Sequence, residues 1–385
     1  MKKRFGEIAT FSRGLTFSKG DVVSESSKRV LRSNNIDLST HSLVFEDIAC
    51  LKESFVIPDE KMLHRNDIFI CMSNGSTQHL GKVAYISEEI GYAFGGFMGA
   101  IHPDESQIFP KYAFYACLSS EYRRFLASIF NGVNINNLKW SDLSDFRIPM
   151  LPLAEQERIV AELDLLQGII DKQKAQLKEL DTLAQSIFYD MFGDPVENEK
   201  GWRTDALKVV APQKTYDGPV PGINGKYWLL NLDKVEQQTG RIIEYVLAPE
   251  DEIGSSTMTF DTSNILYSKL RPYLNKVVIP DGIGYGTSEL VPLRPIPSLL
   301  NRVFFAYLLR SRSFVDFISV RVAGAKMPRV SMEALRDFPI ILPPLGIQQS
   351  FATKVKAIER QKASINASIA ETQKLFDYTM DKYFG

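Results

Sequence analysis

Apolar residues recur at alternating spacings of four and three along residues 153–192, the heptad pattern of a coiled-coil helix. The pattern returns along residues 345–384, where Lys362, Thr372 and Thr379 interrupt it and could fix its register. We expect the two helices to pack on each other; two unrelated amphipathic helices, each on its own domain, are the alternative. The expected seam comprises Ile159, Leu163, Leu166, Ile170, Leu177, Leu180, Ile187, Val355, Ile358, Ile365, Ile369 and Phe376.

The remaining segments have the pattern of strand-rich globular bodies. Residues 66–72, 82–86, 264–268 and 276–279 are short β-branched and aromatic runs bounded by turn-forming residues, which predicts strands. Residues 110–130 and 300–320 predict helices with apolar faces. The fold class is therefore mixed α/β (α+β), with a compact sheet in each body.

The chain contains an internal repeat with an offset of 192 residues. Residues 146–153 (FRIPMLPL) match residues 338–345 (FPIILPPL), and Gln156 matches Gln348, without a gap over about sixty positions. We therefore expect four parts: a first globular domain at 1–150, a central helix at 151–193, a second globular domain at 194–342 and a C-terminal helix at 343–385.

The repeat also predicts how the two helices and the two globular domains are arranged. If the second helix packs antiparallel to the first, it leads back towards the first globular domain, and a pseudo-two-fold axis relates the halves. A helix of about 37 residues is roughly 55 Å long, and DNA half-sites lie about one turn (about 34–36 Å) or more apart. Two readers held at a fixed spacing would suit such a target.

Charge and cysteine content narrow the function. The net charge is −1, but residues 262–330 hold ten basic and three acidic residues, whereas residues 148–199 hold four basic and eleven acidic ones. A local basic surface can bind phosphates on a neutral chain. Cys50, Cys71 and Cys117 are far apart and are expected to be reduced thiols in the cytoplasm. No apolar run is long enough to predict a membrane span.

Several segments resemble those of a known family. Residues 152–160 (PLAEQERIV) resemble the start of the central helix of type I restriction-modification specificity subunits. Residues 266–276 (LYSKLRPYLNK), 325–330 (AKMPRV) and 72–76 (MSNGS) resemble parts of their target recognition domains. The resemblance extends over essentially the whole chain. It departs at Gly346 and Ile347, where acidic residues usually open the second helix, and this puts the second docking interface in doubt.

The resemblance implies a DNA-binding subunit that performs no chemistry itself. Each globular domain would be a target recognition domain that reads one part of a split, asymmetric double-stranded DNA sequence. The helices would set the spacing and dock two methyltransferase (modification) subunits, and two ATP-driven restriction subunits are left open as further partners. S-adenosylmethionine, ATP and Mg would then bind to the partners, and this chain would hold no cofactor.

DNA contact requires cations for phosphates and directed donors and acceptors for base edges. In the second domain Lys269, Arg271 and Lys276 lie on a short loop beside strands and are expected to converge on phosphates; for Arg271, bidentate binding of guanine is the alternative. For any single residue the alternative is a solvated surface group, and Tyr273 could also be a core residue. The full candidate set is Ser73, Asn74, Lys82, Asn134, Asn136, Lys139, Ser268, Lys269, Arg271, Tyr273, Lys276, Lys326 and Arg329.

Catalytic interpretations find little support. The sequence holds no phosphate-binding GxxxxGK[ST] motif, and residues 282–286 (GIGYG) lead into a predicted strand, not a helix, which favours a turn. The four histidines have no metal-ligand spacing, and no Asn-Pro-Pro-Tyr motif is present. Two other functions remain as alternatives: a coiled-coil adaptor that binds no DNA, and a stand-alone DNA nuclease.

Overall fold

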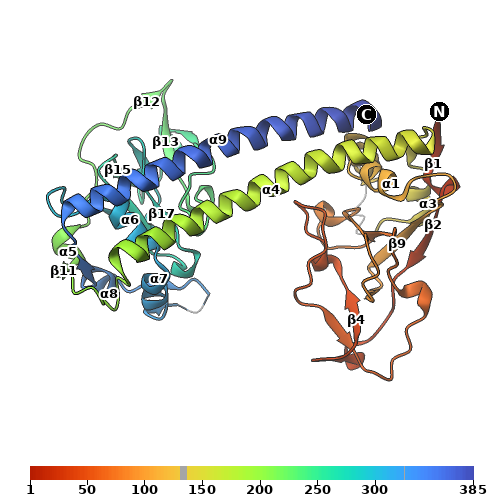
Figure 1. The fold of residues 1–385 in the computed structure, drawn as a ribbon, viewed down its shortest axis with the longest axis horizontal. Helices are drawn as coiled ribbons and strands as arrows, with labels where there is room; N and C mark the ends of the chain where they lie inside the picture. The colour runs from red at the N-terminus through yellow and green to blue at the C-terminus, as the bar shows by residue number, and fades with distance from the viewer. Residues whose placement is uncertain (131–136, 325) are drawn as a thin grey trace. The chain divides into compact units, whose positions relative to one another are not determined.

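The protein is described by a computed structural model that covers residues 1–130, 137–324 and 326–385 (Figure 1). It divides into two compact units: unit 1 comprises residues 1–172 and 368–385, and unit 2 comprises residues 173–367. Each unit contains a strand-rich body and parts of the two long helices, α4 (Leu153–Phe192) and α9 (Leu345–Phe384). The predicted mixed fold with two strand-rich bodies and two packed helices is confirmed.

Two four-stranded sheets form the body of unit 1, in the orders β2-β9-β6-β7 and β3-β5-β4-β8, and β1 pairs with β10. Three shorter helices, α1, α2 and α3, follow the last sheet strand. The elements are β1 Lys2–Arg4, β2 Ala9–Arg13, β3 Val22–Val23, β4 Lys28–Leu31, β5 Ala49–Leu51, β6 Ile68–Cys71, β7 Val83–Tyr85, β8 Ala93–Phe94, β9 Met98–Pro103, α1 Pro110–Ala116, α2 Ser120–Phe130, α3 Trp140–Ser144 and β10 Arg147–Pro149.

Unit 2 contains a sheet of order β17-β16-β19 and a second sheet in which β13 pairs with β12, β14 and β18, and β18 pairs with β15. Unit 2 also contains two smaller pairs of strands, β11 with β22 and β20 with β21. The elements are β11 Thr204–Ala206, α5 Leu207–Val210, β12 Gly222–Ile223, β13 Lys226–Leu230, β14 Leu247–Pro249, β15 Met258–Phe260, β16 Ile265–Ser268, β17 Val277–Val278, β18 Gly284–Gly286, β19 Leu290–Leu293, α6 Arg302–Arg310, α7 Arg312–Ser319, β20 Val322–Ala323, β21 Arg329–Val330, α8 Met332–Arg336 and β22 Pro339–Ile341.

The sequence repeat corresponds to repeated strand pairing. In unit 1 β4 and β8 run parallel with Leu31 opposite Phe94, and in unit 2 β13 and β18 run parallel with Leu230 opposite Gly286. The central strand β6 pairs with β7 and β9, as β16 pairs with β17 and β19. The four predicted strands coincide with β6, β7, β16 and β17.

Each predicted helix at 110–130 and 300–320 is in fact two helices, separated at a buried serine. Ser119 Oγ donates to the carbonyl of Ala116 and accepts from the amide of Tyr122. Ser311, which lies 192 residues later, makes the same two bonds with Leu308 and Phe314. A serine hydroxyl that bonds a free backbone amide favours a helix start, so these bonds separate α1 from α2 and α6 from α7.

A fully buried glutamine connects each long helix to the body beside it. Gln156 Oε1 accepts from the amide of Phe109 (2.8 Å), the N-cap of α1, and its Nε2 donates to the carbonyl of Leu151 (2.8 Å). Gln348 Oε1 accepts from the amide of Asn301 (2.8 Å), the N-cap of α6, and its Nε2 donates to Pro343 (2.7 Å) and Leu299 (3.0 Å). These bonds satisfy backbone groups at helix ends that otherwise lack partners.

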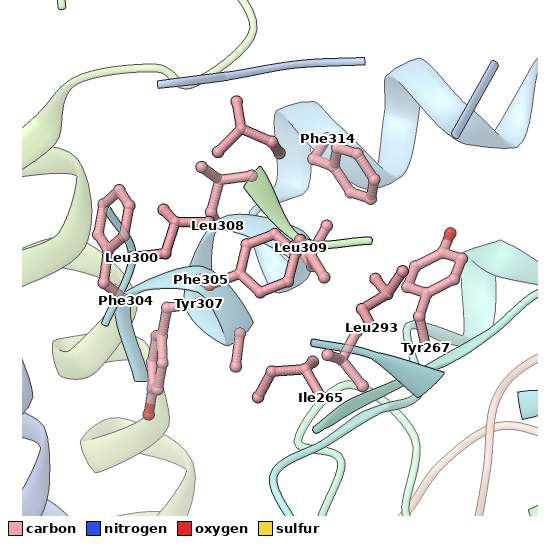
Figure 2. Close-up of a cluster of buried hydrophobic side chains, with 14 of the residues drawn as sticks. Ile265, Tyr267, Leu293, Leu300, Phe304, Phe305, Tyr307, Leu308, Leu309 and Phe314 are labelled. Carbon is pink, nitrogen blue, oxygen red and sulfur yellow. The ribbon is translucent and has the colours of Figure 1, made fainter. Parts of the chain in front are cut away.

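The far end of each long helix is held by an aromatic contact. In unit 2 Phe192 of α4 packs edge-on against Phe304 of α6, with ring centroids 4.6 Å apart. In unit 1 Phe384 of α9 lies 4.7 Å from Tyr112 of α1, the corresponding position of the repeat. Figure 2 shows Phe304 in the hydrophobic core of unit 2, where side chains of α6 pack over β16 and β19.

The two long helices run antiparallel, because the start of α4 and the end of α9 belong to unit 1, and their other ends to unit 2. In unit 1 Arg158 Nη2 donates to the hydroxyl of Tyr383 (2.8 Å). In unit 2 Lys362 Nζ lies 2.7 Å from Asp181 Oδ1. One of the predicted polar interruptions of the seam, Lys362, is thus an ion-pair partner of the facing helix.

The seam residues differ in burial. Six are buried: Ile159, Leu163, Leu166, Ile170, Val355 and Ile358. Six are partly buried: Leu177, Leu180, Ile187, Ile365, Ile369 and Phe376. Towards its end α4 instead buries Ala184, Phe188 and Phe192, spaced by four. That end packs on α6 as well as on α9, so its buried face departs from the heptad seam.

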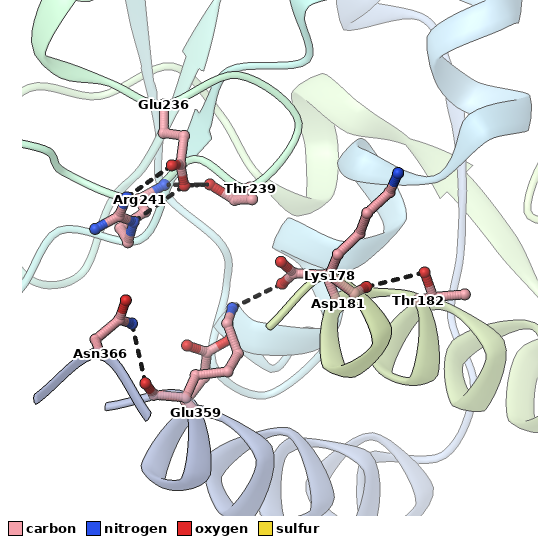
Figure 3. A network of polar contacts seen from close by, with 9 residues as sticks. Lys178, Asp181, Thr182, Glu236, Thr239, Arg241, Glu359 and Asn366 are labelled. Atoms are coloured by element: carbon pink, nitrogen blue, oxygen red, sulfur yellow. Dashed lines mark hydrogen bonds and ion pairs between the residues drawn. The ribbon is translucent and has the colours of Figure 1, made fainter. Parts of the chain in front are cut away.

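Lys362 belongs to a wider set of polar contacts, in which Figure 3 labels its partners Asp181, Glu359 and Asn366. The ammonium of Lys362 also bonds Glu359 Oε1 on its own helix (3.0 Å), and the Lys362 side chain is 12% exposed. Nearby, Glu236 binds Arg241 through two hydrogen bonds of 2.7 and 3.0 Å. Burial acts to lower the pKa of Lys362, but the bonds to Asp181 and Glu359 outweigh it and raise that pKa. The stabilisation is therefore present below the ordinary lysine pKa and is lost as the pH rises through the raised value.

We expect Gln348→Met to destabilise unit 2, because the methionine keeps the volume and removes all three hydrogen bonds. Each buried backbone group left without a partner costs on the order of 1–3 kcal/mol. Urea unfolding of the full chain measures the loss, and faster hydrogen exchange at the amide of Asn301 locates it. Gln361→Met, at an exposed position of the same helix, is the control; equal stability of the two variants would contradict the assignment.

Substitution of the two partners of the interhelical ion pair is expected to change the stability by different amounts. Asp181→Asn leaves a mostly buried ammonium with Glu359 alone, which should cost about 1 kcal/mol, between the values for exposed and buried pairs. Lys362→Met removes the charge itself and should be neutral or stabilising. Thermal unfolding at pH 7 measures both; a larger loss for Lys362→Met than for Asp181→Asn would refute this account.

Candidate nucleic-acid interface

Three segments that are far apart in sequence meet at one junction in unit 1. The chain that leaves β6 forms the first: the amides of Met72 and Ser73 both donate to the carbonyl of Phe97, each at 3.0 Å. Phe97 is the second, at the turn before β9. The third is the stretch before α3, where the amide of Leu138 donates to Met72 (2.8 Å) and Asn137 bridges to Ser73.

Unit 2 builds the same junction from corresponding positions. The amide of Lys269, just after β16, donates to the carbonyl of Glu289 (3.0 Å), which precedes β19. The amide of Val330 donates to Lys269 (2.8 Å), and Arg329 bridges to Leu270. Glu289 and Arg329 lie 192 residues after Phe97 and Asn137, so the two junctions are repeats of each other.

The junctions bring together candidates that the sequence places far apart. In unit 1, Ser73 and Asn74 lie on the first segment, and the exposed Lys139 lies on the third. In unit 2 the first segment carries Lys269, Arg271 and Tyr273, and the third carries Lys326 and Arg329. The remaining candidates Asn134 and Asn136 lie outside the described residues.

The loop after β16 has a constrained backbone that presents its side chains. Arg271 (φ 50°) and Asn275 (φ 50°) adopt the left-handed conformation on either side of a 3-10 turn, Pro272–Leu274. The side chain of Asn275 is buried and donates to the carbonyl of Arg310 (3.0 Å). Arg271 and Tyr273 are exposed, Tyr273 by 51%. Non-glycine residues in this conformation persist where the surroundings enforce it, and often at functional sites.

Three of the residues predicted to bind DNA bond to groups within their own unit. Lys82 is buried, and its Nζ donates to the carbonyl of Ile36 (2.9 Å); Lys276 Nζ donates to Leu232 (2.5 Å) in the corresponding part of unit 2. Burial lowers the pKa of both lysines. The buried Ser268 donates to the carbonyl of Leu270 (3.0 Å). These side chains connect loops within each body, so we do not retain them in the interface.

Several of the basic side chains at 262–330 also make contacts within unit 2. Arg310 donates to the carbonyl of Val277 and Arg302 to that of Pro280. Arg294 pairs with the largely buried Asp261 at 3.0 Å. Together with Lys276, these cations support backbone carbonyls and a carboxylate, so the charge available to DNA is smaller than the sequence count indicates.

The sequence reasoning missed two residues at the junctions, Phe97 and Glu289. Phe97 is 72% exposed and borders a surface hollow of about 830 Å³, which Arg32, Asn34 and Asn74 also line. The only available signal was the repeat offset, which aligns Phe97 with Glu289; neither residue belongs to a recognisable DNA-binding pattern.

Glu289 fixes the orientation of Arg329. Its carboxylate accepts from Nη2 (2.7 Å) and from Nε (3.0 Å) of that guanidinium, and the Arg329 side chain remains 44% exposed. The hydrogen bonds from Arg329 hold the pKa of Glu289 below its ordinary value. The pair therefore stays ionised at neutral pH, and its contribution is lost only as the pH falls through that lowered value.

Other kinds of site find no support in the described part of the chain. No cluster of three or more histidine, cysteine or acidic residues there could hold a metal ion. Among those residues no helix has the length and apolar character needed to cross a membrane. The glycine-rich segment expected to be a turn contains β18 at Gly284–Gly286 and then leads into β19, not into a helix.

Comparison with known proteins identifies a family. The profile described as "Type I restriction modification DNA specificity domain" matches residues 1–182 and 254–373. The StySPI specificity subunit of Salmonella potsdam is 35% identical over 45% of this chain and 37% of its own length. The EcoKI specificity subunit of Escherichia coli K12 is 32% identical over 51% of this chain and 42% of its own length. Each alignment thus spans less than half of that relative.

A solved structure has the same fold. The type I restriction-modification S subunit of M. genitalium superimposes with a TM-score of 0.57, over 100% of this chain and 96% of the other. The sequence identity is 13%, so this likeness concerns the fold alone.

We expect Arg271 to contact a phosphate and not a base edge. Its replacement by alanine should then weaken duplex binding about equally at target and non-target sequences, because a phosphate contact carries no sequence information. The logarithm of the association constant for DNA falls with the logarithm of the salt concentration, and the magnitude of this slope should decrease by about one. Fluorescence anisotropy of the assembled complex over a salt series measures both. Arg203→Ala, an exposed cation of unit 2 outside the junction, is the control; an unchanged slope for Arg271→Ala would contradict phosphate contact.

Proposed function

This chain belongs to the family of type I restriction-modification DNA specificity subunits, and we propose that it reads a bipartite double-stranded DNA target, one half with each unit. In this family the specificity subunit is not the catalytic subunit. The chemistry would therefore reside in partners that carry S-adenosylmethionine, ATP and Mg. The free cysteines, Cys50, Cys71 and Cys117, would suit work in the reducing cytoplasm.

The observation that supports two-part reading is the repeated junction with unlike residues. Equivalent backbone bonds hold the three segments in both units, yet the corresponding side chains differ: Phe97 and Glu289, Asn137 and Arg329. Side chains on a rigid scaffold carry sequence discrimination through their donors, acceptors and apolar groups. Two equal scaffolds with different side chains suit an asymmetric target.

We propose further that α4 and α9 set the spacing between the half-sites and dock two modification subunits. Both helices carry exposed apolar side chains: Leu165 (66%) and Leu183 (47%) on α4, and Leu375 (51%) and Tyr378 (67%) on α9. Exposed apolar groups on a helix favour a protein partner, and the excess of acidic residues on α4 disfavours contact with DNA. Whether restriction subunits also join this complex stays open.

The first experiment is methylome sequencing of a host that expresses this chain with its modification subunit, against a strain without the chain. We expect a split methylated motif that is lost without the chain. Exchange of residues 200–340 for those of a relative with another specificity should change one half of the motif, and exchange of residues 1–150 the other half.

The outcomes separate the alternatives. An unchanged methylome in an otherwise active system would rule out a specificity role and favour the coiled-coil adaptor. Cleavage of duplex DNA by the purified chain alone would instead favour the stand-alone nuclease. A motif that changes in both halves after one exchange would refute the assignment of one half-site to each unit.

A further inference from the structure

We propose that one position of the repeat, Phe97 in unit 1 and Glu289 in unit 2, determines which base pair each unit accepts at its junction. Phe97 would select an A·T pair through the thymine methyl group. Glu289 would select a G·C pair by positioning Arg329 for guanine. This inference rests on the proposed function and adds the residue and the chemistry of its specificity.

Phe97 combines a fixed backbone with an exposed ring. Its carbonyl accepts from Met72 and Ser73, and the next residue, Met98, donates its amide to Gly95 (2.8 Å). The Gly95 amide in turn donates to Leu31 of β4 (2.9 Å). A ring that is 72% exposed gains nothing from the core of its own unit, so the fixed backbone holds it ready for an external contact.

The surroundings of Phe97 identify that contact as a base edge. The hollow beside it is lined among others by Ser33, Asn34, Ser73 and Asn74, and Asn74 Nδ2 donates to Ser33 Oγ (3.2 Å). Amides and hydroxyls bond base edges in the major groove, and phenylalanine contacts the thymine methyl there. A cytosine in place of that thymine carries a hydrogen at C5, so the contact between a methyl group and the ring would be lost.

Unit 2 presents a different chemistry at the same place. Glu289 occupies the Nε–Nη2 edge of Arg329. The other edge, formed by Nη1 and the second hydrogen of Nη2, has the two parallel donors that guanine O6 and N7 accept. The carboxylate thus restricts the guanidinium to one plane through the opposite edge, and the Arg329 side chain as a whole is 44% exposed.

The test is selection of duplexes from a randomised library by the complete complex, followed by sequencing. Phe97→Ala should reduce the preference for thymine at one position of the first half-site about fourfold, the equivalent of one buried methyl group. Arg329→Ala should relax one guanine of the second half-site by about 5- to 150-fold, and Glu289→Gln should relax the same guanine to a smaller extent. The other half-site should be unaffected by each change.

Matched controls come from the same units. Phe45→Ala removes another partly exposed phenylalanine of unit 1, and Asp337→Asn breaks an exposed ion pair of unit 2 with Lys208; neither should alter the motif. A transplant tests sufficiency: Phe97→Glu with Asn137→Arg should replace the thymine preference of the first half-site by guanine.

Two failures are distinguishable. If exchange of a whole unit changes its half-site but Phe97→Ala, Glu289→Gln and Arg329→Ala leave both half-sites unchanged, the inference is wrong and the proposed function stands. If neither unit exchange nor these variants alter the selected sequences, the proposed function fails as well.

Discussion

The structure depends on how the ends of its two long helices are anchored. Each body receives the start of one helix and the end of the other: Gln156 and Phe384 are fixed in unit 1, Gln348 and Phe192 in unit 2. The glutamines satisfy helix-end backbone groups that would be costly to bury alone. The aromatic side chains bury a large apolar area at the opposite ends. Neither helix therefore relies only on the partly buried middle of the seam.

The two junctions are held together by backbone hydrogen bonds. Backbone hydrogen bonds, which do not depend on side-chain identity, hold the three segments together in both units. The side chains at those positions are consequently free to differ, and Phe97 and Glu289 differ in both size and charge. A scaffold of this kind can change its ligand preference at little cost in stability, because the altered groups are exposed and bear little of the core packing.

Charge serves two purposes in unit 2. Arg302, Arg310 and Lys276 cross-link loops by donating to backbone carbonyls, whereas Arg271 is exposed on a constrained loop and Arg329 is oriented by Glu289. A cation that is shielded from water requires partners within its own body, so the residues of the first group stabilise the fold. The second group and the exposed Lys326 keep their charge at the surface, which explains how a chain of net charge −1 can present a small and directed cationic surface.

The sequence alone determined the mixed fold class, the repeat of 192 residues and the two long helices, because periodicity and self-similarity are local properties of the chain. It also indicated the loops around Ser73 and Arg271. Tertiary structure decided the rest. The turn at Phe97 and Glu289 joins those loops only through backbone pairing, and whether Lys82 or Lys276 faces solvent depends on a carbonyl far away in sequence. Likewise the heptad pattern placed the seam, but the packing of α4 on α6 selected Phe188 and Phe192 as its anchors, since burial there depends on a surface that no spacing within the helix encodes.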